Sequence, residues 1–74
     1  MLLVRIDPAQ RMDRWYSVEI VSTLFDTCAV VCRWGSRRTA YQRERVVAIG
    51  PDQAEAMAMA LAARKMARGY ERVE

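Results

Sequence analysis

Five arginines and a tryptophan fall within one short segment whose composition suits contact with phosphate. Trp34 is followed at once by Gly35, and Glu44 is the only acid between residues 33 and 45, so this segment carries +4 while the rest of the chain nets −1. Guanidinium groups bind phosphate oxygens, and an indole ring can stack on a base or sugar. The segment therefore predicts a nucleic-acid contact made by Arg33, Trp34, Gly35, Arg37, Arg38, Arg43 and Arg45. The competing interpretation is a solvated arginine-rich surface with Trp34 as a packing residue of the core.

Other kinds of site have few candidate residues. The sequence has no histidine, and Cys28 and Cys32 stand four residues apart on one expected strand, which separates them by roughly 13 Å. That distance is too long for a disulfide, so we expect two buried or half-buried thiols, with a reactive Cys32 thiolate in its basic surroundings as the open alternative. There is no glycine-rich phosphate loop and no nucleophile-base pair at a recognisable spacing. We expect no catalytic activity, no metal site and no cofactor.

The length of 74 residues predicts a single domain over residues 1–74. The composition, 53% hydrophobic and 28% charged, is typical of a globular protein. No run approaches the ~18 apolar residues of a membrane helix. The apolar start, residues 1–4, is interrupted by Arg5 and Asp7 too early for a signal peptide. From the sequence we expect a cytoplasmic protein.

Period-two alternation predicts four strands, over residues 2–7, 14–21, about 28–34 and 41–49. In the second, Tyr16, Val18 and Ile20 share a face, which we assign to the core. Residues 35–39 are expected to form a hairpin turn, and Phe25 to be the apolar anchor of the 22–27 loop. Since the hairpin pairs the third and fourth strands, their arginines are expected to converge on one surface beside the turn.

A helix is predicted over residues 51–68. Gly50 can act as N-cap before Pro51, and Gly69 can take the left-handed conformation that ends a helix, with Tyr70 folded back onto the last turn. The expected core stripe is Ala54, Met57, Ala58, Leu61 and Ala62, and it also includes Lys65, which we expect to extend its methylenes along the edge of the core. Met59 is either exposed or covered by a curved sheet. The predicted fold class is α+β, a single antiparallel sheet of four to five strands packed against one C-terminal helix.

In these features the sequence resembles the WGR domain, a small module named for a Trp-Gly-Arg motif. The resemblance covers nearly the whole chain and rests on the order and spacing of 5–7, 14–16, 24–25, 33–35, Ala54, Leu61, Lys65 and 68–70. It implies a sheet-and-helix fold that occurs alone in small bacterial proteins and as one domain of poly(ADP-ribose) polymerases. There the motif tryptophan and nearby basic residues contact DNA near a strand break. Here Ser36 replaces the motif arginine, and Arg38 stands where the family often has glycine.

Two functions follow as hypotheses. The first is a non-enzymatic nucleic-acid-binding module, with DNA as the expected partner, at ends or nicks. The alternative is a protein-docking or self-association module that uses Trp15 and the Met59 side of the helix to bind a partner protein or a second copy. Neither hypothesis involves a membrane or a small-molecule substrate. The salt dependence of binding distinguishes the two hypotheses, because charge-driven DNA binding weakens as the salt concentration rises, whereas apolar docking persists.

Overall fold

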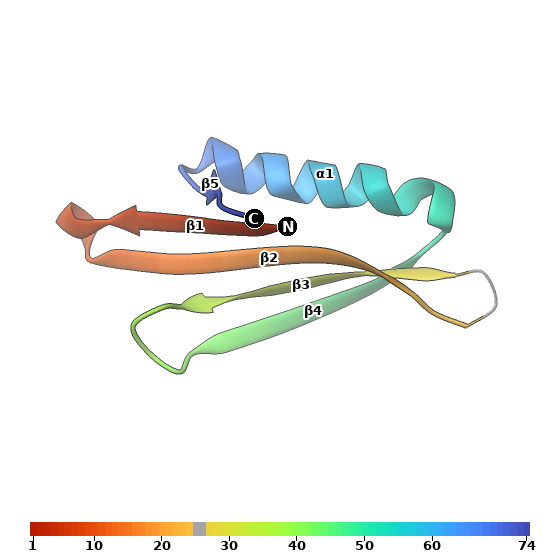
Figure 1. Ribbon diagram of the computed structural model, residues 1–74, viewed down its shortest axis with the longest axis horizontal. Coiled ribbons are helices and arrows are strands. Elements are labelled where there is room, and N and C mark those ends of the chain that lie inside the picture. The colour runs from red at the N-terminus through yellow and green to blue at the C-terminus, as the bar shows by residue number, and fades with distance from the viewer. Residues whose placement is uncertain (25–26) are drawn as a thin grey trace.

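A computed structural model describes residues 1–24 and 27–74 of the chain, which form five strands and one α-helix (Figure 1). In chain order the elements are β1 Leu2–Asp7, the 3-10 turn η1 Pro8–Gln10, β2 Met12–Ser22, β3 Cys28–Ser36, β4 Gln42–Ile49, α1 Pro51–Ala67 and β5 Glu71–Arg72. The predicted α+β class is therefore confirmed. Phe25, expected to anchor the loop after β2, lies outside the described residues. Within these residues no helix combines the length and apolar character needed to cross a lipid bilayer.

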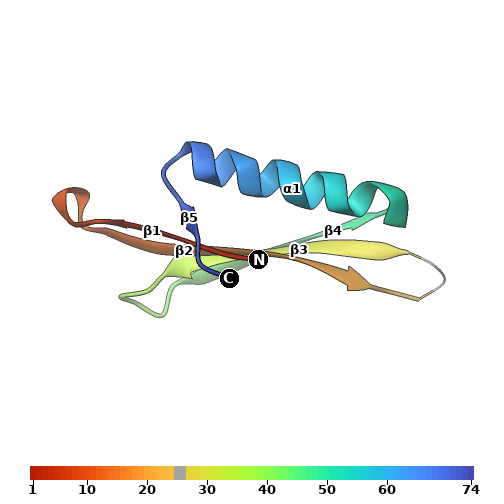
Figure 2. The same ribbon diagram turned by 45° about the horizontal axis from the view of Figure 1, so that its top comes forward.

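The strands form one antiparallel sheet in the order β4-β3-β2-β1-β5. Figure 2 shows α1 lying along one side of this sheet, with no helix or strand of the described chain on the other side. We call the side toward α1 the helix face and the other side the open face. Because side chains alternate along a strand and directly paired residues share a face, the register assigns every strand residue to one of the two.

The core lies between α1 and the helix face. Ala54, Ala58 and Ala62 recur at four-residue spacing on α1 and are all buried. Small side chains on this stripe let the helix approach the sheet closely, where it meets the buried sheet residues Leu3, Tyr16, Val18, Val30 and Cys32. Leu61 and Met57 are only half-buried and pack at the edge of this cluster. The predicted stripe is thus confirmed, with alanines at its centre.

Ile20 was expected in the core, and this prediction is wrong, since the side chain is 44% exposed. Ile20 does lie on the helix face, opposite Val30. However, β1 pairs with β2 only as far as Leu2 opposite Ser17, and the chain start then contacts β2 at Val18 and Glu19 through Met1. Beyond that point no described strand lies on the outer side of β2, so the flank of Ile20 is open to solvent.

Both ends of the helix follow the predicted rules. Gly50 is the N-cap with an extended backbone, and Pro51 occupies the first turn. At the other end Gly69 has a positive φ of 95°. The N–H groups of Gly69 and Tyr70 donate to the carbonyls of Met66 and Lys65 at 3.0 and 3.1 Å, the paired bonds of a Schellman motif. Tyr70 is buried against the last turn as predicted, and the chain then returns to pair as β5 with β1.

Candidate nucleic-acid interface

Trp34 lies on the helix face of β3, near the end of the strand that leads into the hairpin. It pairs with Tyr16 on β2 and with Arg43 on β4. Its ring stacks on that of Tyr16, with centroids 6.3 Å apart and planes inclined by 25°. Trp34 is half-buried and packs against the core, so it is in part a packing residue, while its contact with nucleic acid stays a prediction. One part of the indole supports the fold, and the rest is accessible to a ligand.

Gly35 is a strand residue, because β3 continues to Ser36 and the turn spans residues 37–41 instead of the predicted 35–39. The residue is buried, and a Cβ added to it would strike the backbone carbonyl of Tyr41 and lie 3.1 Å from the Cα of Gln42. Glycine is therefore required by the close approach of β4, and not by a special backbone conformation. The N–H of Ser36 donates to the Tyr41 carbonyl at 3.1 Å, which holds the strands together at this point.

Ser36, at the place of the motif arginine, is the last residue of β3 before the hairpin loop. Its hydroxyl oxygen accepts a hydrogen bond from the N–H of Arg38 at 3.1 Å, a local turn of the kind that serine side chains stabilise. The N–H of Arg37 donates to the Asp13 carbonyl at 2.9 Å, and an Arg37 guanidinium nitrogen lies 3.5 Å from a carboxylate oxygen of Asp13. The Arg37 charge is thus partly offset, whereas Arg38 is exposed at the loop.

The expected convergence of the arginines on one surface is wrong. Arg43 and Arg45 lie on the helix face, opposite Trp34 and Cys32. Arg33 pairs with Glu44 on the open face, and the two side chains form an ion pair with N and O atoms 2.6 Å apart. The physical reason is the alternation of the strand, because Arg33 and Trp34 are adjacent residues and must point to opposite sides of the sheet.

The helix supplies cations that the sequence analysis did not assign to the site. Between α1 and the strands β3 and β4 lies a groove of about 230 Å³, which we call the cationic groove. Among the described residues, four positive ones line it and no acid does. Its lining residues are Tyr16, Cys32, Trp34, Arg45, Val47, Met57, Leu61, Arg64, Lys65 and Arg68. The sequence signal was the basic cluster of the last helical turns, Arg64, Lys65 and Arg68, which the linear sequence does not connect with the strands.

Lys65 crosses the end of the cationic groove. Its ammonium lies over two aromatic rings, 4.8 Å from the centroid of Tyr16 and 5.3 Å from that of Tyr70. The predicted extension of its methylenes along the core edge is confirmed, since the residue is half-buried. Burial lowers the pKa of Lys65 from its usual value of 10.5, and the nearby charges of Arg68 and Arg14 lower the pKa further. Two faces of aromatic π-density partly compensate the desolvated charge.

A second hollow of about 550 Å³ adjoins the hairpin. Its lining residues are Arg11, Asp13, Arg14, Trp15, Trp34, Gly35, Ser36, Thr39, Tyr41, Lys65 and Tyr70. Trp34 and Lys65 line both hollows, so they stand where the two meet. A ligand lying across both would contact an aromatic ring and an ammonium at its centre. Beside the hairpin, the Arg43 guanidinium lies 5.6 Å from the centroid of the Tyr41 ring.

Charge is divided between the two sides of the sheet. On the helix face the strands carry five arginines and one acid, namely Arg5, Arg14, Arg43, Arg45, Arg72 and Asp7. On the open face they carry one arginine and four acids, namely Arg33, Asp13, Glu19, Glu44 and Glu71. The helix adds Arg64, Lys65 and Arg68 near the first group. An anionic polymer is therefore attracted to the helix face of the molecule.

In a comparison with protein families, the chain matches the model of the WGR domain over residues 1–74. The chain belongs to the WGR family. WGR domains are known as nucleic-acid-binding modules in proteins related to poly(ADP-ribose) polymerases, and the domain itself is a binding domain without catalytic activity. Comparison with curated proteins and with solved structures gave no match. Of the residues at the WGR motif, Trp34 lines both hollows, whereas Gly35 and Ser36 line only the second.

Proposed function

We propose that this WGR protein binds DNA through its helix face, with the cationic groove as the principal phosphate site. The observation that supports the proposal is the grouping of four cations around one groove whose described lining contains no acid, beside a partly accessible Trp34. These cations are Arg45, Arg64, Lys65 and Arg68. Phosphates lie against these cations, and a base or sugar at an end or nick stacks on the indole. Arg38 and Arg43 extend the positive surface toward the hairpin. Arg33 takes no part in it, because it faces the other way.

The proposal gives a quantitative salt dependence. Each neutralised phosphate contributes about −0.9 to the slope of log K against log salt. Four groove cations then give a slope of about −3.6, so raising salt from ~50 to ~200 mM weakens binding by roughly 150-fold. The measurement is fluorescence anisotropy with labelled blunt, nicked and single-stranded DNA at several salt concentrations. Tighter binding of the blunt and nicked duplexes than of a continuous hairpin-closed duplex is the result expected for recognition of ends.

Matched variants locate the site. Replacing Arg64 and Arg68 together by alanine should flatten the slope by about 1.8 units, since two counterion-releasing contacts are lost. Arg33→Ala is the control, because it removes an arginine from the open face and should leave the slope unchanged. Trp34→Phe keeps an aromatic ring on Tyr16 and should weaken end binding with the slope nearly the same. A folded protein without affinity for any of these DNAs at ~50 mM salt would contradict the proposal, as would an Arg33→Ala variant that loses as much slope as the helix double variant.

A further inference from the structure

The open face carries an apolar patch that the nucleic-acid function does not use. Two rows of paired residues cross β2, β3 and β4 on this face, and their apolar members are Val21, Ala29, Val31, Val46 and Ala48. We call these five residues the valine patch. Val21 and Val46 are 45% and 56% exposed, whereas Ala29 and Val31 on the strand between them are buried. In most domains a sheet face with such residues is covered by a second layer, and the described chain supplies none here.

The exposed area of the chain is large for its mass. The accessible surface is 5469 Å² for a chain of 8.5 kDa. A monomer of this mass ordinarily exposes about 4650 Å², so the excess is about 800 Å². The cause is the flat shape, with Cα extents of 46 × 24 × 16 Å. About 800 Å² is also the area that each partner buries in a protein interface of standard size.

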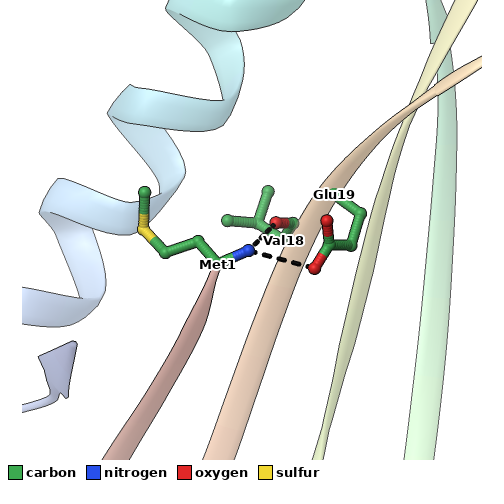
Figure 3. A network of polar contacts seen from close by, with 3 residues as sticks. All are labelled: Met1, Val18 and Glu19. Carbon is green, nitrogen blue, oxygen red and sulfur yellow. Dashed lines mark hydrogen bonds and ion pairs between the residues drawn. The ribbon is translucent and has the colours of Figure 1, made fainter. Parts of the chain in front are cut away.

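Charges beside the valine patch are already paired within the chain. Glu44, which precedes Val46 on the open face, forms its 2.6 Å ion pair with Arg33. Glu19 lies in the same row as Val31 and Val46. Its carboxylate accepts a hydrogen bond from the Met1 ammonium at 3.0 Å, and the same ammonium donates to the Val18 carbonyl (Figure 3). Two copies of this region can therefore meet without bringing unpaired like charges together. The helix face, with its excess of arginine, has the opposite property.

We propose that the open face is the interface of a homodimer in which two sheets pack face to face across a two-fold axis at the valine patch. Twofold symmetry is the commonest arrangement of homo-oligomers, and it sets each patch against its own copy. Aligned sheets pack about 10 Å apart, so the exposed Val21 and Val46 of one copy can pack against the open face of the other. In this dimer the two helices face outward, and each Trp34 remains accessible on its own side. The proposal does not rest on nucleic-acid binding.

The test is sedimentation equilibrium of the DNA-free protein. An interface of standard size corresponds to dissociation constants of micromolar or tighter, so we expect a dimer at ~100 μM. Val46→Glu should raise the dimer dissociation constant by at least about 10-fold, because a charge would be buried without a partner. Met59→Glu is the matched control, since Met59 is also 56% exposed but lies on α1. It should leave the constant unchanged.

Folding is checked by circular dichroism, and Val21→Glu on β2 repeats the test from a second strand if Val46→Glu disturbs the edge strand β4. Weaker association of either open-face variant, with Met59→Glu like the parent, supports the dimer. A parent protein that remains monomeric at ~200 μM overturns it. An equal loss in Met59→Glu also overturns it, because association would then use the helix.

Discussion

A series of three glycine-to-alanine variants tests how the WGR motif is built into the sheet. Gly35→Ala places a methyl group against the Tyr41 carbonyl and close to the Gln42 Cα. Both neighbours are backbone, so no side-chain rotation relieves the contact, and β4 must separate from β3 where Ser36 is bonded to Tyr41. Overpacking of this kind costs about 3 kcal/mol. That is a large share of the roughly 4–11 kcal/mol available to a domain of this size.

The other two glycines provide graded controls. At Gly50 the backbone φ is −65°, and the added Cβ meets only the end of the Asp52 side chain. We expect a change within about 0.5 kcal/mol there, because the lost N-cap preference is offset by reduced freedom of the unfolded chain. Gly69 has a φ of 95° with the flexible Arg5 side chain nearby. Alanine in this left-handed conformation should cost about 1–2 kcal/mol.

The measurement is reversible thermal or denaturant unfolding followed by circular dichroism. At about 4–8 °C per kcal/mol for a domain of this size, Gly35→Ala should lower Tm by roughly 12–24 °C. The expected order of destabilisation is Gly35, then Gly69, then Gly50. If Gly35→Ala melted within a few degrees of Gly50→Ala, the steric explanation of the motif glycine would be refuted.

Three further predictions concern the core. Leu61→Ala should cost about 1–2 kcal/mol in denaturant unfolding, below the range for a fully buried leucine, because Leu61 is half-buried; a cost above about 4 kcal/mol would contradict its place at the edge. The pKa of Lys65 is lowered in the folded state, so its ammonium loses its proton at a lower pH in the folded chain than in the unfolded chain. The parent should therefore gain stability relative to Lys65→Met as pH rises toward 10.5, and a pH-independent difference would argue against desolvation. A thiol reagent should modify half-buried Cys28 before buried Cys32 under native conditions, as mass spectrometry of digests would show, and the reverse order would indicate an activated Cys32.

The sequence predicts the elements well because their signals are local. Turn residues and alternation place the strands to within two residues at most ends, and the Pro51 and Gly69 signals mark the helix ends. Ile20 shows where local signals fail. Its alternation is that of a core residue, and its exposure is decided by where β1 ends, which is a property of another part of the chain.

The composition of the candidate site was predicted less well for the same kind of reason. A count of charge along the sequence groups Arg33 with Arg43 and Arg45, although alternation alone puts Arg33 and Trp34 on opposite faces. The pairing of Arg33 with Glu44 depends on the position of the hairpin loop, which was predicted at residues 35–39 and lies two residues further along the chain. The contribution of Arg64 and Arg68 depends on how the helix crosses the sheet, and no short-range pattern specifies that crossing.

Because one sheet separates the helix face from the open face, the two proposed functions can be perturbed independently. The docking alternative that uses Trp15 and the Met59 side of the helix stays a hypothesis, and it would need two surfaces, since Trp15 lies on the open face and Met59 on the exposed surface of α1. Arg64 and Arg68 substitutions should change the salt slope of DNA binding and leave the dimerisation of the DNA-free protein, measured by sedimentation equilibrium, unchanged. Val46→Glu should weaken dimerisation and leave the intrinsic affinity of one groove for a short DNA end unchanged. Loss of both properties in a single folded variant would show that the faces are coupled, and the division of charge across the sheet would then no longer explain how the protein works.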